Sequence, residues 1–284
     1  MSSMENIIQW LRDRVEPGAQ LCLDSRLIEK GDVFFACPGA MTDGRQYIGQ
    51  ALENGAAAVV AQPGRGWEGG TGVAAPMLEV EGLYAMLGAL AHEWYGRPSE
   101  ALSVVAITGT NGKTTTAQWV AAALNAENVP CGTVGTLGVT LPDGSNLGGA
   151  LTTPDVLTMH RSLAAIRDAG GKAAAIEASS IGLDQGRLDQ VRIEIAGFTN
   201  LTRDHLDYHK TVADYKRAKF SLFDWPGLRH AVINVDDPAG VELAAAASGL
   251  EPLTYSLQQG GAADIHARDI QTGTYGLIFN LETR

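Results

Sequence analysis

The first part of the chain has the hydrophobic spacing of a small α/β domain. Apolar residues recur about every three to four positions in three stretches and predict helices near Met4–Val15, Tyr47–Asn54 and Leu83–Tyr95. Compact apolar stretches predict strands near Leu21–Asp24 and Val33–Cys37, followed by the apolar run Ala56–Ala61. Turn formers from Gly96 to Ser99 then break the pattern. We therefore expect a first domain over residues 1–98.

From Leu102 the pattern changes to a repeated strand, loop and helix. Apolar, β-rich segments predict strands near Leu102–Ile107, Ala173–Ile176, Ile193–Phe198 and Ala231–Val235. Helical spacing is found between them, near Thr114–Asn125, Val156–Ala169, Val212–Phe223 and Val241–Ala247. This alternation predicts a doubly wound, mostly parallel α/β domain over residues 99–284, with ligands beyond the carboxyl ends of its strands. After Pro252 the pattern is β-like, near Leu253–Leu257, Ile265–Ile270 and Tyr275–Leu281.

The composition narrows the classes of protein to which this chain can belong. With 34 Gly and 11 Pro in 284 residues, it stays below the ~25–30% that indicates low complexity. A net charge of −11 disfavours nonspecific binding to nucleic acid or to anionic membranes. No apolar run approaches the ~18–20 residues that span a bilayer, and Met1–Arg14 is too charged for a signal peptide, so we expect a cytoplasmic protein. Cys22, Cys37 and Cys131 lack the spacing of a zinc site and are interpreted as buried, reduced thiols.

The strongest chemical signal is the segment Thr108–Thr115, which reads TGTNGKTT between a predicted strand and a predicted helix. Glycines let the main chain curl around phosphates, and a helix N-terminus offers free N–H groups to them. Lys113 is expected to reach the β- and γ-phosphates, and Thr114 to bind Mg²⁺. Ile107 stands where the common GxxxxGK[ST] pattern has its first glycine, and no NKxD-like guanine motif is found. Both departures disfavour a kinase or a GTPase.

Polar residues also follow two other predicted strands. Glu177 is the candidate acidic partner for Mg²⁺, with a solvated strand-end carboxylate as the alternative. The next polar residues suit an anionic or sugar-bearing ligand, or simply cap the loop: Ser179, Ser180, Gln185 and Arg187. Residues 198–209 contain two His and two Asp beyond a strand end, which favours contact with metal or phosphate.

Lys219 lies in a predicted helix close to Phe220 and Phe223. Partial burial there would lower the pKa of its amine. A neutral amine can react with CO₂ to form a carbamate, which turns a cation into an anionic oxygen ligand. On spacing alone, an ordinary surface lysine is the simpler interpretation.

Together these motifs resemble the ATP-dependent Mur ligases of peptidoglycan synthesis, most closely the MurE type. The loop at Thr108–Thr115 marks the wider family, which includes the folylpolyglutamate synthetases. The MurE type is indicated by four features together: Asp24-Ser25-Arg26, Thr152-Thr153-Pro154, Ser179 to Arg187, and Tyr215 to Lys219. The resemblance runs from about Asp24 to the end of the chain. Leu151 and Ile181 depart from the family pattern and weaken only the details of substrate binding.

The resemblance implies a function for each domain and for particular residues. In the N-terminal domain, the UDP moiety would lie near Leu23 and Ser25, and its diphosphate near Gly39, Ala40 and Met41. In the central domain, ATP would lie on Gly109, Thr110, Asn111, Gly112, Lys113, Thr114 and Thr115. The muramoyl-peptide substrate would contact Thr152, Thr153, Ser179, Gln185 and Arg187. Mg²⁺ would be held by Thr114 or Thr115, Glu177 and His205, and Lys219 matches the carbamylated lysine of the family; Lys113, His205 and Lys219 would be the catalytic residues.

The implied reaction adds a third amino acid, meso-diaminopimelate or lysine, to UDP-N-acetylmuramoyl-L-alanyl-D-glutamate through an acyl phosphate. Members of the family carry a C-terminal, amino-acid-binding domain for which this chain has no room. We therefore expect a truncated chain, inactive alone, whose amino-acid substrate the sequence does not reveal. We also expect a monomer that binds neither nucleic acid nor membrane. The alternatives are another Mur-family or folylpolyglutamate-type ligase, which binding of uridine nucleotides would distinguish, and a noncatalytic nucleotide-binding module.

Overall fold

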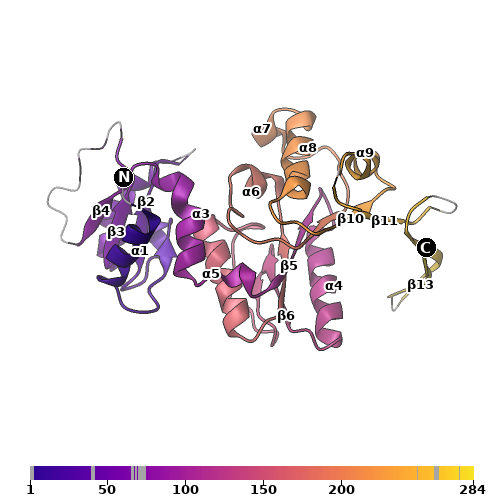
Figure 1. The fold of residues 1–284 in the computed structure, drawn as a ribbon, viewed down its shortest axis with the longest axis horizontal. Coiled ribbons are helices and arrows are strands. Elements are labelled where there is room, and N and C mark those ends of the chain that lie inside the picture. Colours follow the sequence, from indigo (N-terminus) through magenta and orange to yellow (C-terminus); the bar gives the residue numbers. More distant parts are fainter. Residues whose placement is uncertain are drawn as a thin grey trace. The chain divides into compact units, whose positions relative to one another are not determined.

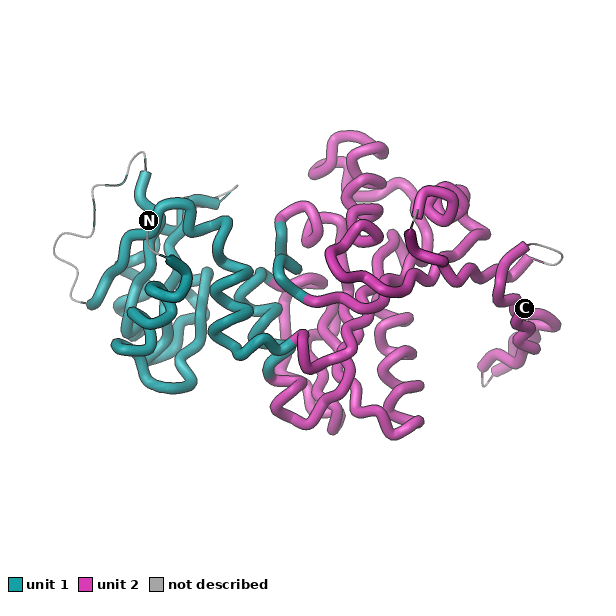
Figure 2. The backbone as a smooth tube through the Cα atoms, viewed as in Figure 1, with its two compact units in different colours: residues 1–98, 155–164, 186–191 teal, residues 99–154, 165–185, 192–284 magenta. Residues whose placement is uncertain are grey.

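The chain folds into two compact units, which are coloured separately in Figure 2. The computed structural model describes residues 3–39, 42–64, 67, 69, 75–247, 249–258, 262–274 and 276–284. The first unit comprises residues 1–98, 155–164 and 186–191, and the second comprises residues 99–154, 165–185 and 192–284. The hydrophobic pattern gave no sign that residues 155–164 and 186–191 group with the first unit.

The first unit is built on a four-stranded parallel sheet whose strands follow the order of the sequence. The strands are β1 (Leu21–Cys22), β2 (Val33–Ala36), β3 (Ala58–Ala61) and β4 (Met77–Glu79). The helices are α1 (Met4–Arg12), α2 (Ile48–Glu53) and α3 (Leu83–Trp94). Alternate residues of β2 enter different cores: Phe35 packs with α1 and α3, whereas Phe34 packs with α2. Because both faces are covered, the buried strands read as continuous apolar runs.

The second unit contains a nine-stranded sheet in the order β13-β12-β11-β10-β9-β5-β8-β6-β7. Figure 1 labels β5, β6, β10, β11 and β13 of this sheet. Its strands are β5 (Ser103–Thr108), β6 (Cys131–Gly135), β7 (Gly138–Thr140), β8 (Ala173–Glu177), β9 (Ile195–Phe198), β10 (His230–Asn234), β11 (Leu253–Ser256), β12 (Ile265–Gly273) and β13 (Gly276–Thr283). Only β7 and β13, at the two edges, pair antiparallel with their neighbours. The helices are α4 (Lys113–Ala126), α5 (Val156–Asp168), α6 (Ser180–Asp184), α7 (Leu206–His209), α8 (Val212–Phe220) and α9 (Pro238–Ala246).

Strand β5 lies at the point where the strand order reverses. From β5 the chain passes through α4 to β6, returns to β8 beside β5, and then places β9 on the other side of β5. Crevices at such a switch point, beyond the carboxyl ends of the strands, are where open α/β sheets bind ligands. The segment Gly109–Thr115 therefore begins at this switch point, between the ends of β8 and β9.

The predicted α/β class with a mostly parallel sheet is confirmed. The three cysteines are buried and unpaired, and burial raises the pKa of Cys22 and Cys37 to about 12. Among the α-helices and strands formed by the described residues, five short ones were not predicted: β4, β6, β7, α6 and α7. Strand β6 is rich in glycine and is buried along its whole length beside β8. Its assignment depends on that neighbour, because glycine has low intrinsic strand preference.

Candidate active site

The two glycines of the phosphate loop, residues Gly109–Thr115, allow the backbone to approach its neighbours closely. Gly109 has φ +144°, and a Cβ atom there would lie 1.9 Å from Thr199 Oγ1. Gly112 has φ +86° and precedes α4, whose N-terminus receives no side-chain cap. The first-turn N–H groups of α4 therefore remain available for an anion, which the helix dipole also favours.

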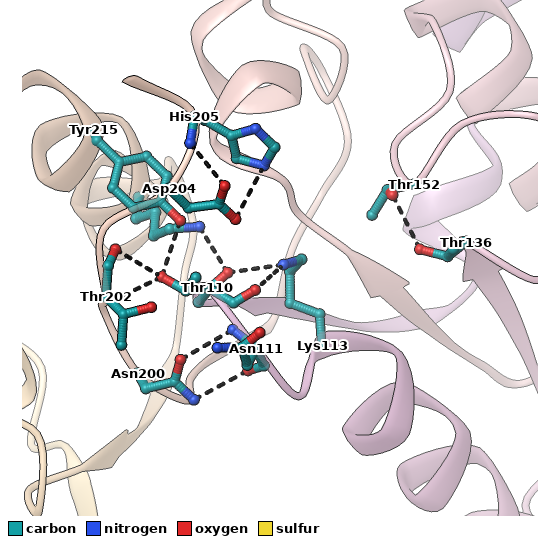
Figure 3. Close-up of polar contacts among 12 residues, drawn as sticks. Thr110, Asn111, Lys113, Thr136, Thr152, Asn200, Thr202, Asp204, His205 and Tyr215 are labelled. Carbon is teal, nitrogen blue, oxygen red and sulfur yellow. Dashed lines mark hydrogen bonds and ion pairs between the residues drawn. The ribbon is translucent and has the colours of Figure 1, made fainter. Parts of the chain in front are cut away.

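Two lysine side chains meet at one carbonyl oxygen of this loop. Lys113 Nζ donates to the carbonyl oxygens of Gly109 and Thr110, both at 2.9 Å (Figure 3). Lys219 Nζ, from α8, donates to the same Gly109 oxygen at 2.7 Å. Burial lowers the pKa of Lys113. Burial and the positive charge of Lys113 lower the pKa of Lys219 to about 7, although Asp204 opposes this shift.

Lys219 is far more buried than its sequence context suggested. Only 1% of it is exposed, and its ammonium lies 4.5 Å from the centre of the Tyr215 ring. Tyr215, one helical turn earlier, is fully buried, and its hydroxyl lies 3.0 Å from Thr110 Oγ1. A lysine with a pKa of about 7 has a substantial neutral fraction near neutral pH, and that is the form a carbamate requires.

Glu177, the last residue of β8, accepts hydrogen bonds from residues that follow the two neighbouring strands, β5 and β6. It is 2% exposed, and it accepts from Thr114 Oγ1 at 2.9 Å and from the N–H of Thr136 at 2.8 Å. Gly135 makes this approach possible, because a Cβ there would lie 2.1 Å from Glu177 Oε1. Thr136 Oγ1 also lies 3.0 Å from Thr152 Oγ1. Thr136 was not predicted as a site residue, since nothing in the glycine-rich β6 marks its end as a site.

The donor set at Glu177 suits Mg²⁺ only if other ligands contribute. A carboxylate and a hydroxyl, those of Glu177 and Thr114, are hard oxygen ligands of the type that this ion prefers. His205 is near Asp204, at 3.7 Å, rather than in contact with Glu177. Within the described ranges, no three His, Cys, Asp or Glu side chains form a group that could hold a metal. An ion at Glu177 would therefore take further ligands from water and phosphate oxygens, as Mg²⁺ commonly does.

Several predicted substrate residues have structural partners in the second unit. Thr153 Oγ1 donates to the Glu177 carbonyl oxygen at 2.7 Å and accepts from the Ser179 N–H at 3.0 Å. Ser179 caps α6 by accepting from the N–H of Gly182 at 3.0 Å. Gln185 ends α6. Arg187 groups with the first unit rather than with these residues.

The predicted UDP-binding residues follow β1 and β2 in the first unit. Leu23 is half-buried and packs against a core cluster of that unit. Ser25 is buried, and its hydroxyl donates to Gln50 Oε1 at 2.6 Å. Gly39 donates its N–H to the carbonyl oxygen of Thr42 at 2.9 Å, which closes a turn after β2. Ala40 and Met41 lie outside the described residues.

Two models of known protein families match the sequence of this chain. The family model described as Mur ligase middle domain matches residues 107–283, and the one described as Mur ligase family, catalytic domain, matches residues 19–95. The chain is 46% identical over 288 residues to the UDP-N-acetylmuramoyl-L-alanyl-D-glutamate--2,6-diaminopimelate ligase of Acidovorax sp. (strain JS42), covering 99% of the chain and 57% of that relative. The chain thus spans a little over half the length of the curated relatives it matches.

Solved structures of other proteins share the fold of this chain. A structure of a UDP-N-acetylmuramoyl-L-alanyl-D-glutamate--2,6-diaminopimelate ligase matches with a TM-score of 0.72 at 33% identity, over 98% of this chain and 57% of that one. The MurF ligase from Thermotoga maritima, solved in complex with ADP, matches with a TM-score of 0.60 over 93% of this chain and 56% of that one. At 21% identity, this second likeness indicates the fold alone. No helix formed by the described residues is both long enough and apolar enough to cross a membrane.

Proposed function

Because the chain belongs to the Mur ligase family, we propose that it supplies the ATP-binding and UDP-substrate-binding parts of an amide ligase. The reaction joins 2,6-diaminopimelate to UDP-N-acetylmuramoyl-L-alanyl-D-glutamate, as the names of its relatives indicate for those proteins. The observation that carries the proposal is the phosphate loop at the switch point of the sheet, with Lys113 within it and the Thr114–Glu177 pair at its end. An enzyme that uses ATP and a UDP-linked precursor belongs in the cytoplasm.

The chemical problem is that a carboxylate is a poor electrophile. In the proposed first step, an oxygen of the substrate carboxylate attacks the γ-phosphorus of ATP, and the bond to ADP breaks. In the second step, the amine of the amino acid attacks the acyl carbon, loses a proton and expels phosphate. Holding the reacting groups in line can contribute about 7–11 kcal/mol to such a step.

The residues of the chain have separate parts in this proposal. The N–H groups at the start of α4 bind the phosphates, and Lys113 exchanges its contacts with loop carbonyls for contacts with phosphate oxygens. Thr114 and Glu177 would hold Mg²⁺, and a bound Mg²⁺ would supply positive charge beside the phosphates. Thr136, which donates to Glu177, and Thr152, whose hydroxyl lies 3.0 Å from that of Thr136, are candidates to orient the muramoyl-peptide carboxylate.

Two titrations test this proposal on the chain itself. The chain should bind ATP in the presence of Mg²⁺ and, independently, UDP-N-acetylmuramoyl-L-alanyl-D-glutamate. Ligation assays with a protein that also carries the family's C-terminal domain, comparing diaminopimelate with lysine, would then establish the amino acid. If the chain binds ATP but no uridine nucleotide, a folylpolyglutamate-type ligase becomes the better assignment; if it binds neither ligand, the proposal fails.

A further inference from the structure

Residues Thr199–Thr202, here named the bracing segment, hydrogen-bond to the phosphate loop from the end of β9. The N–H of Thr110 donates to the carbonyl oxygen of Asn200 at 2.8 Å, and the N–H of Thr202 donates to Thr110 Oγ1 at 2.9 Å. Thr199 Oγ1 donates to the carbonyl oxygen of Asn111 at 2.7 Å. These contacts join parts of the chain about ninety residues apart, so that the shape of the loop depends on a distant segment.

Asn200 makes the most specific of these contacts. Its Oδ1 accepts from the N–H of Asn111 at 2.9 Å, and its Nδ2 donates to the carbonyl oxygen of Asn111 at 3.1 Å (Figure 3). One side-chain amide thus satisfies both backbone groups of a single loop residue. The planar amide of Asn or Gln carries a donor and an acceptor side by side, and Gln is longer by one methylene.

These bonds determine which loop groups can face a ligand. The N–H groups of Thr110 and Asn111 are both used by Asn200, so they are not free for phosphate. The carbonyl oxygen of Asn111 accepts hydrogen bonds from Thr199 and Asn200. Its partial negative charge therefore points towards these donors and would not repel a bound phosphate. The groups left for phosphate are the first-turn N–H groups of α4 and the ammonium of Lys113.

We propose that Asn200 is a positioning residue that holds the phosphate loop in its nucleotide-binding shape through its two hydrogen bonds to the backbone of Asn111. This inference depends on the proposed ATP binding, because it explains how the same loop is kept ready for the nucleotide. Loss of the side chain leaves the Asn111 backbone with the Thr199 hydrogen bond but without the two from Asn200, and part of the binding free energy is then spent on ordering the loop.

The chain offers a matched control for this proposal in Asn125. Its Oδ1 accepts from the N–H of Cys131 at 2.8 Å, and its Nδ2 donates to the carbonyl oxygen of Cys131 at 3.0 Å. It thus makes the same pair of backbone hydrogen bonds within the same unit, but to a residue outside the phosphate loop. A purely structural effect of losing such a pair should appear equally in both variants.

The experiment titrates the 284-residue chain with ADP and Mg²⁺ and measures thermal unfolding in parallel. Asn200→Ala should raise the Kd for ADP about tenfold, whereas Asn125→Ala should keep it within about twofold of the parent at a comparable loss of thermal stability. Asn200→Asp, which keeps the shape and the acceptor but loses the donor, should also weaken binding. Amide exchange at Asn111 should quicken in Asn200→Ala and remain unchanged in Asn125→Ala.

The outcomes separate this inference from the proposed function. If the parent binds ADP and Asn200→Ala binds it equally well, Asn200 does not position the loop, and the proposed function stands. Equal weakening in Asn200→Ala and Asn125→Ala would mean that affinity follows stability, which also overturns the inference. If the parent chain binds no nucleotide, the proposed function fails and the inference fails with it.

Discussion

The two sides of β5 use polar groups in different ways. On the β9 side, neutral groups of the bracing segment and Tyr215 hydrogen-bond to the phosphate loop itself. On the β8 side, donors from Thr114 and Thr136 converge on the buried carboxylate of Glu177. The first arrangement fixes a backbone shape and the second presents a charge. Neutral groups can hold a shape at little desolvation cost, whereas buried charges are costly and are typical of functional sites.

The two lysines at Gly109 differ in a related way. Lys113 belongs to the loop and is half-buried, so a phosphate can replace its carbonyl partners. Lys219 comes from α8, is 1% exposed and lies between the Gly109 carbonyl oxygen and the Tyr215 ring. We therefore expect Lys113 to act as a cation towards ATP and Lys219 to act after losing its charge.

The largest expected effect concerns Lys113. In a ligase that also carries the family's C-terminal, amino-acid-binding domain, Lys113→Ala should lower kcat for ATP-dependent ligation by about 10²–10³-fold, because a group that stabilises developing charge is removed. The measurement is ADP release in the presence of both the peptide substrate and diaminopimelate. An unchanged rate would falsify the role assigned to this lysine.

In the same longer ligase, a smaller loss, about 10–100-fold, is expected for Lys219→Ala, because it removes the amine whose proposed carbamate would supply an anionic oxygen ligand to a metal. Short carboxylic acids added to this variant should restore part of the activity by replacing the carbamate. Mass spectrometry under native conditions should also show a CO₂ adduct on the parent that the variant lacks. If neither rescue nor adduct is observed, Lys219 acts as a simple ammonium.

The lowered pKa of Lys219 predicts a pH dependence of stability. The pKa of Lys219 is about 7 in the folded protein and about 10.5 in the unfolded chain. Between these pH values the unfolded chain therefore binds more protons than the folded protein does, and the free energy of unfolding increases as the pH rises. From pH 7 to pH 9, the parent should gain on the order of 2 kcal/mol of unfolding free energy relative to Lys219→Met. Urea unfolding in CO₂-depleted buffer measures this difference; parallel pH profiles for the two proteins would show that the ammonium is not destabilised.

The smallest effect is expected at Thr136. Thr136→Val retains the N–H that donates to Glu177 but loses the hydroxyl, which donates to Glu177 Oε2 at 3.3 Å and lies near Thr152. In a ligase that also carries the family's C-terminal domain, kcat/KM for the peptide substrate should therefore fall about tenfold. Thr136→Ser keeps the hydroxyl and should retain most of the activity. The KM for ATP should stay unchanged in both; a rise there would instead place Thr136 at the nucleotide.

The parts of the candidate site that are formed by residues close together in the sequence could be predicted. The phosphate loop is recognisable because its glycines, its lysine and the start of α4 are contiguous, and Glu177 because it ends a strand beside β5. Thr136 could not be predicted, since it becomes part of the site only through the pairing of β6 with β8. Ser179 was given a ligand-binding role with loop capping as the alternative, and the structure shows its hydroxyl capping the start of α6.

By itself, the sequence determined the alternation of strands and helices, the class of fold and the position of the phosphate loop, because each arises from interactions between residues close along the chain. The tertiary structure alone decided that Asn200 holds Asn111, that Lys219 is buried against Gly109, and that residues 155–164 and 186–191 group with the first unit. These contacts depend on the order in which strands pair, and that order is set by the burial of whole faces rather than by any local pattern.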